Sequence, residues 1–142
     1  MQLNPYLVFN GQCEEAFKFY EKRLGGKIEA MIPHTGTPAE AHVPLEWRNK
    51  IMHAHMTVGS TVLMGSDAPP EHYQAPQGFS LSIGVKEVAE GERIFKELEQ
   101  GGKVQMPMQK TFWAAGFGMV VDRFGIPWMV NCEQAGAAAG DD

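Results

Sequence analysis

The chain has 142 residues, of which 44% are hydrophobic and 20% charged, and this composition predicts a globular protein made of one domain or two small modules. The net charge is −5, with 12 scattered basic residues against 17 acidic ones, so no basic stripe is available for a nucleic-acid partner. No apolar run approaches the roughly 18–20 residues that cross a bilayer, and the first residues carry no secretory pattern, so we expect a cytoplasmic protein with no membrane partner.

The first half of the chain predicts one helix among short strands. A helix over residues 12–24 is indicated by one apolar face at helical period, made of Cys13, Ala16, Phe17, Tyr20 and Leu24. The Gly25-Gly26 pair then ends it, because glycine takes the left-handed conformation without strain. Around this helix we expect a strand over 5–10, a strand over 27–33, a short helix over 38–42, and a hairpin over 50–58 and 61–65 that turns at Gly59-Ser60.

The second half predicts the same order of elements. Residues 66–78 contain three prolines and predict a linker. Beyond it, alternating apolar residues predict a strand over 79–85, and a helix over 88–100 again ends in a glycine pair. We then expect a strand over 103–108, a loop over 109–116, a hairpin over 117–121 and 126–132 that turns at Asp122-Arg123-Phe124-Gly125, and a frayed tail over 134–142.

This order indicates a chain built twice. The triplet Gly-Gly-Lys follows the helix in both halves, at 25–27 and 101–103. The chain therefore predicts an α+β fold of two tandem βαβββ modules, residues 4–65 and 79–133. A helix covers only one face of a four-stranded sheet, so the other face of each module needs cover or surrounds a cleft.

Several motifs resemble the PhnB-like branch of the vicinal oxygen chelate superfamily, which includes glyoxalase I, extradiol dioxygenases and bleomycin-resistance proteins. They are Pro5-Tyr-Leu-Val-Phe-Asn-Gly11, Glu14-Glu-Ala-Phe-Lys-Phe-Tyr20, Ile51-Met-His-Ala-His55, Leu63-Met-Gly-Ser-Asp67, Phe112-Trp113 and Asp122-Arg-Phe-Gly-Ile-Pro-Trp-Met-Val-Asn131. The resemblance implies a partly closed mixed-sheet cleft between the two modules with the helices outside. It also implies a small-molecule ligand in that cleft and a homodimer.

The resemblance further implies where a metal would bind. Metal-dependent members of the superfamily carry histidine, glutamine or glutamate on the first and last strand of each module. This chain has Pro5, Ser80 and Met129 at three of those positions, and the fourth falls near Leu63 or Met64. None of these side chains is a ligand that a divalent metal prefers, so the resemblance implies no metal at the superfamily positions.

His53 and His55 suggest a relocated metal site. Two residues apart on a strand, they share one face, where two imidazoles could hold zinc, iron or nickel. A third ligand would have to come from a separate set of side chains: His42, Glu46, Asp67 or His72. The other interpretation, which we favour, is that one histidine is a hydrogen-bonded core residue and the other faces solvent or a dimer interface.

Aromatic and methionine side chains are candidates for the lining of the cleft. Trp47, Phe112, Trp113 and Trp128 could stack on a planar ligand, and Met129 would add an adaptable apolar surface. The alternative is an ordinary strand core, which we favour for all of them except Trp113, because Trp113 lies in a predicted loop.

Two functions remain open at this point. The first is a small-molecule binding protein without chemistry. The second is a metal-dependent lyase, isomerase or dioxygenase that uses His53 and His55. Loop carboxylates such as Glu40 and Asp67 could act as general bases, but we favour the interpretation that they are solvated. A metal or an extra ligand in the cleft would separate the two functions.

Overall fold

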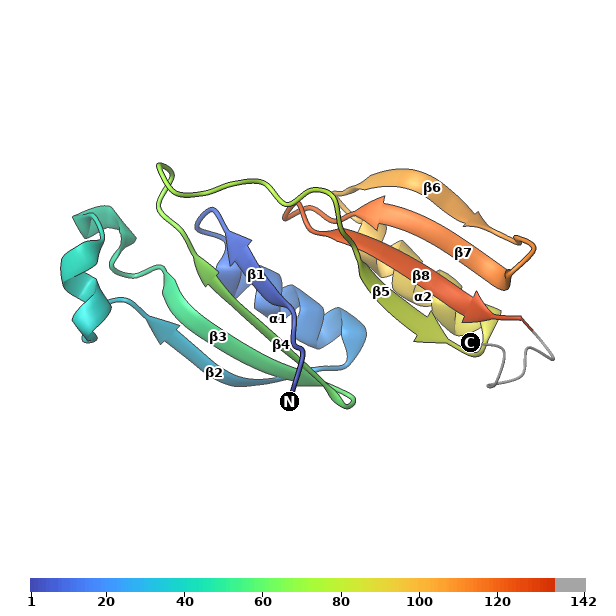
Figure 1. The fold of residues 1–142 in the computed structure, drawn as a ribbon, viewed down its shortest axis with the longest axis horizontal. Helices are drawn as coiled ribbons and strands as arrows, with labels where there is room; N and C mark the ends of the chain where they lie inside the picture. The colour runs from blue at the N-terminus through green and yellow to red at the C-terminus, as the bar shows by residue number, and fades with distance from the viewer. Residues whose placement is uncertain (135–142) are drawn as a thin grey trace. The chain divides into compact units, whose positions relative to one another are not determined.

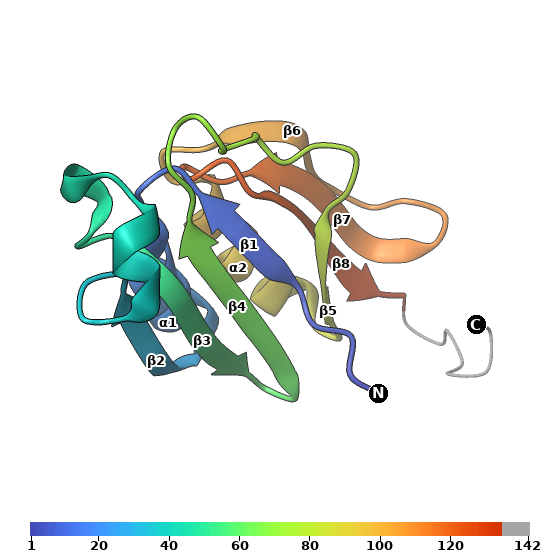
Figure 2. The same cartoon turned by 60° about the vertical axis from the view of Figure 1, so that its left-hand side comes forward.

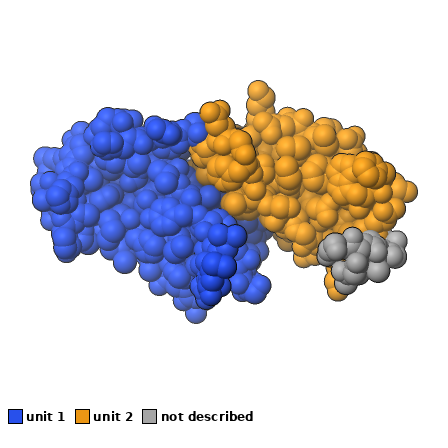
Figure 3. All heavy atoms as spheres, in the orientation of Figure 1, with its two compact units in different colours: residues 1–75 blue, residues 76–142 orange. Residues whose placement is uncertain are grey.

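The computed structural model of the chain describes residues 1–134. The chain divides into two compact units, residues 1–75 and residues 76–142 (Figure 3). The tail predicted for residues 134–142 lies outside the described part of the chain from residue 135 onward. Within residues 1–134, neither α-helix has the length and apolar character needed to span a membrane.

Unit 1 contains one helix and a four-stranded mixed sheet (Figure 1). Its elements are β1 (Tyr6–Phe9), α1 (Cys13–Leu24), β2 (Lys27–Pro33), the 3-10 helices η1 (Pro38–His42) and η2 (Leu45–Trp47), β3 (Ile51–Val58) and β4 (Thr61–Asp67). The strand order is β1-β4-β3-β2. The β1–β4 pair is parallel, and the β4–β3 and β3–β2 pairs are antiparallel.

Unit 2 repeats this plan. Its elements are β5 (Leu81–Val85), α2 (Val88–Glu99), β6 (Lys103–Gln109), β7 (Ala114–Val121) and β8 (Pro127–Glu133). The strand order is β5-β8-β7-β6, with β5 parallel to β8 and the other pairs antiparallel. The prediction of an α+β fold made of two βαβββ modules is confirmed, and no sheet in residues 1–134 closes into a barrel.

Each helix covers one face of its own sheet (Figure 2). Helix α1 buries Cys13, Ala16, Phe17 and Tyr20, and α2 buries Gly91, Ile94, Phe95 and Leu98. These are the faces that the helical period predicts. Helix α1 ends as expected at Gly25, whose φ of 78° is left-handed.

Three strand boundaries differ from the sequence prediction by two residues or more. Strand β4 continues to Asp67, because the backbone of β4 remains paired with β1 through the Phe9–Asp67 position. Strand β7 begins already at Ala114, where residues predicted as loop pair with Glu133 of β8. Strand β5 begins only at Leu81, so residues 79 and 80 precede it.

The second face of each sheet, opposite the helix, is called here the open face. Side chains alternate along each strand, so every second residue points to it. In unit 1 the open face carries Tyr6, Val8, Ile32, His53, His55 and Met64. In unit 2 it carries Ser82, Phe117, Met119, Val121, Met129 and Asn131. Each candidate binding residue on a strand can therefore be assigned to the helix-covered face or to the open face.

Candidate functional site

The two histidines of β3 lie side by side on the open face of unit 1. The ring centroids of His53 and His55 are 6.4 Å apart, and the Tyr6 ring lies 6.0 Å from that of His53. Both histidine side chains are half-buried. The prediction that a spacing of two places both imidazoles on one face is confirmed.

Among the described residues, no further metal ligand joins this pair. Within residues 1–134, no three histidine, cysteine, aspartate or glutamate side chains are grouped so that they could hold a metal ion. Asp67, one of the possible third ligands, shares the helix-covered side of β4 with Leu63 and Gly65. It is thus on the opposite side of the sheet from His53, and the use of this pair in catalysis stays a prediction.

Asp67 has a structural role. It is 4% exposed, and its Oδ1 accepts hydrogen bonds from the backbone N–H groups of Gly11 and Cys13, both at 2.9 Å. Its Oδ2 accepts a third from the N–H of Ile51, also at 2.9 Å. One buried carboxylate thus joins the β1–α1 turn, the first turn of α1 and the start of β3. Its acceptor positions are occupied, which argues against a general-base role.

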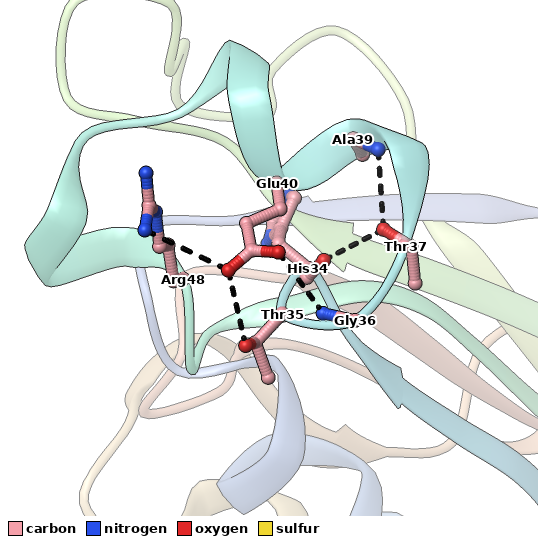
Figure 4. Close-up of polar contacts among 7 residues, drawn as sticks. All are labelled: His34, Thr35, Gly36, Thr37, Ala39, Glu40 and Arg48. Atoms are coloured by element: carbon pink, nitrogen blue, oxygen red, sulfur yellow. Dashed lines mark hydrogen bonds and ion pairs between the residues drawn. The ribbon is translucent and has the colours of Figure 1, made fainter.

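Glu40 is engaged in a similar way in the segment between β2 and β3 (Figure 4). Its carboxylate accepts from the Gly36 N–H at 3.3 Å and from the Thr35 hydroxyl at 3.4 Å, and it lies 3.6 Å from Arg48. His34 is buried beside it, and its Nδ1 lies 2.8 Å from the carbonyl of Lys50. These bonds hold the segment folded, and they account for Glu40 without catalysis.

Two of the four aromatic candidates pack inside their own unit. Trp47 packs over the β1–α1 turn, where its ring fills the space beside Gly11, and the Lys50 ammonium lies 6.0 Å from the ring centroid. Trp128 is only 4% exposed on the helix-covered face of β8, and its Nε1 donates to Asp122 at 2.8 Å. Trp128 is therefore a core residue that anchors the β7–β8 turn, and its side chain lies on the opposite side of the sheet from the open face.

The other two aromatic candidates are exposed. Phe112 is 89% and Trp113 47% exposed, and their ring centroids are 4.8 Å apart. The Trp113 ring also lies 5.3 Å from that of Phe117, which is on the open face of β7. Trp113 is thus exposed beside that open face, and a role of Phe112 and Trp113 in ligand binding stays a prediction.

A cavity of about 420 Å³ lies on the open face of unit 2. Its floor is formed by strand side chains, and residues 76–80, just before β5, form one wall. The strand residues are Gln105, Met119, Val121, Pro127 and Met129. This volume falls within the range of roughly 300–1,000 Å³ typical of small-molecule sites.

The cavity brings together two positions that the sequence resemblance singled out. Ser80 and Met129, which stand where metal-dependent relatives carry ligands, both line it. In the described part of the chain, residues 1–134, no lining residue carries an imidazole, carboxylate or thiolate, so this donor set does not fit zinc or a similar metal ion.

The sequence did not reveal every lining residue. Residues 76–78 were predicted as linker, yet they form part of the wall. Gln105 was missed because the β6–β7 register shifts between Val104 and Met106, so simple alternation does not show which face its side chain occupies. Only the observed strand pairing identifies it.

The two cysteines are buried thiols. Cys13 and Cys132 are both free and fully buried. Burial raises the pKa of the Cys13 thiol, and the nearby carboxylates of Asp67 and Glu14 raise it further. Burial likewise raises the pKa of Cys132, with Glu92 and Glu90 adding to the effect. Since the thiolate is the reactive form, neither residue is a nucleophile at neutral pH.

Comparison with known proteins agrees with this fold. Protein YjdN of Escherichia coli (strain K12) is 37% identical over 139 residues, covering 92% of this chain and 95% of that protein. The crystal structure of protein PA1353 from Pseudomonas aeruginosa is 52% identical, covers 94% of this chain and 98% of that one, and superposes with a TM-score of 0.86.

A more distant structure shares the fold alone. It is described as a putative 3-demethylubiquinone-9 3-methyltransferase, PhnB protein, from Bacillus cereus, and it is 21% identical with a TM-score of 0.79. It covers 93% of this chain and 99% of that chain. The family model of the Glyoxalase/Bleomycin resistance protein/Dioxygenase superfamily matches residues 2–130. The chain belongs to this superfamily.

Proposed function

We propose that the protein binds a small organic molecule, and that the ligand is held on the open face of unit 2. The observation that carries this proposal is the cavity of about 420 Å³ that includes Ser80 and Met129. Apolar side chains line most of such sites, with a few polar groups that orient the ligand. Met119, Val121, Pro127 and Met129 would supply the apolar surface here, and Ser80 and Gln105 the polar groups. The expectation of a ligand between the two modules stays a separate prediction.

Filling the cavity with a larger side chain should weaken the binding of a small apolar probe. Ser80 is half-buried and lines the cavity, so Ser80→Phe would place a ring in the space that a ligand needs. The uncharged fluorescent probe 1-anilinonaphthalene, which brightens in apolar surroundings, reports binding. We expect Ser80→Phe to weaken its affinity by about tenfold or more, because a filled cavity removes the probe's apolar contacts.

The matched control is Ser60→Phe, which adds the same ring at the exposed turn between β3 and β4. This variant should bind the probe like the wild type, and circular dichroism should show that both variants are folded. Equal affinity of wild type, Ser80→Phe and Ser60→Phe would mean that the probe binds elsewhere and that the cavity is not the site.

We further propose that the protein forms a homodimer, and a cytoplasmic location stays a prediction. The support for a dimer is the open face of unit 1, where Tyr6, Val8 and Ile32 are between 37% and 45% exposed. They lie on the two edge strands of one sheet face, with His53 between Tyr6 and Ile32. Exposed apolar side chains on one face are typical of interaction surfaces. Analytical ultracentrifugation should give twice the chain mass of 15.7 kDa at micromolar concentration. A single species of the chain mass would contradict the dimer.

A further inference from the structure

We propose that the ligand of the unit 2 cavity is uncharged, an inference that rests on the proposed function and adds the ligand's chemical class. Among residues 1–134, no aspartate, glutamate, lysine, arginine or histidine lines the cavity. A charged group held against this lining gives up part of its water and gains no counter-ion from the lining, which costs more than placing a neutral polar group there. The lining therefore selects against ions of either sign.

The basic residues nearest in the chain do not change this picture. Lys103 begins β6 and pairs with Val121, so its side chain lies on the open face, but it is exposed to solvent, where its ammonium group keeps its water. Arg123 lies in the β7–β8 turn, and its Nε donates a hydrogen bond to the carbonyl of Gln100 at 3.1 Å. Neither side chain lines the cavity. A ligand anion would thus find no cation among the groups that contact it.

The polar groups that do line the cavity suit neutral hydrogen-bonding partners. Gln77 and Gln105 each offer an amide with both donors and an acceptor, and Ser80 offers a hydroxyl. Met119 and Met129 provide flexible, polarisable thioethers that adapt to an apolar or aromatic body. The ligand class that fits is an amphipathic molecule with a carbonyl, hydroxyl or amide group and no ionised group.

A matched pair of probes tests the charge directly. 1-Anilinonaphthalene is uncharged, and 8-anilinonaphthalene-1-sulfonate carries a sulfonate on the same ring system. We expect the sulfonate to bind the wild-type protein at least about tenfold more weakly than the uncharged probe, because its charge must be desolvated without a partner. Fluorescence titrations of both probes give this ratio.

Adding a cation to the lining should reduce the preference for the uncharged probe over the sulfonate. Gln105 lies on the edge strand β6, where a lysine is easily accommodated. Gln105→Lys should improve the affinity for the sulfonate until it is within about threefold of the uncharged probe, through the new charge pair. Gln109→Lys adds the same charge to the same strand outside the lining and should leave the wild-type ratio unchanged.

The outcomes separate this inference from the proposed function. A low sulfonate affinity that rises in Gln105→Lys, but not in Gln109→Lys, supports an uncharged ligand. Equal wild-type affinities for the two probes, both lost in Ser80→Phe, would overturn the charge selection and leave the binding function in place. Failure of both probes to bind the wild type would overturn the binding function itself, and the inference with it.

Discussion

Replacing Asp67 with alanine should lower the free energy of unfolding of unit 1 by about 3–5 kcal/mol, since three backbone donors, two of them in buried hydrogen bonds, lose a charged acceptor. The donors are the N–H groups of Gly11, Cys13 and Ile51, each 2.9 Å from the carboxylate. They come from three separate segments, so the loss affects the junction of β1, α1 and β3 together. Urea unfolding measures the change.

Amide hydrogen exchange locates the effect. Exchange protection should fall first at Gly11, Cys13 and Ile51 in Asp67→Ala. Glu71→Ala is the control, because Glu71 is an exposed carboxylate four residues further along the chain, and it should change stability by less than about 0.5 kcal/mol. A loss below about 1 kcal/mol in Asp67→Ala would contradict the structural role assigned to this carboxylate.

The second large effect is expected from Gly91→Ala in α2. A Cβ at residue 91 would overlap the Sγ of Cys132 on β8, which is fully buried and has no room to retreat. Overpacking of this kind should cost about 2–3 kcal/mol, even though alanine is the better helix former. Thermal or urea unfolding of the variant measures the loss.

A second substitution should restore the packing. Cys132→Ala removes the Sγ, and the nearest remaining atom is then the Val85 Cγ2 at 3.3 Å. The double variant Gly91→Ala/Cys132→Ala should therefore be within about 1 kcal/mol of Cys132→Ala alone. Gly84→Ala, where an added Cβ meets nothing within 4 Å, is the control and should be close to the wild type. Additive losses in the double variant would mean that the clash is not the cause.

The sequence predicted the features that depend on local patterns. The apolar face of α1 follows from its helical period, and the β7–β8 turn follows from Asp122 to Gly125, whose φ of 89° requires glycine. The shared face of His53 and His55 follows from a spacing of two in a strand. Each of these predictions needs only residues that are close in the chain.

The features that the sequence missed depend on distant contacts. Asp67 looked like a free loop carboxylate because its three partners lie 16 to 56 residues away. Trp128 could not be assigned to one face before the pairing of β7 with β8 was known. The cavity itself joins residues 76–80 with β6, β7 and β8, and the irregular register of β6 hides the contribution of Gln105.

The most direct measurement of the binding site is a methyl NMR titration with 1-anilinonaphthalene, using protein labelled with 13C at the methionine methyl groups. Met119 and Met129 line the cavity, whereas Met56 is fully buried in the core of unit 1. We predict saturable shifts of the Met119 and Met129 methyl signals, with the Met56 signal unchanged. Saturable binding that leaves both cavity methionines unshifted would contradict a small-molecule site on the open face of unit 2.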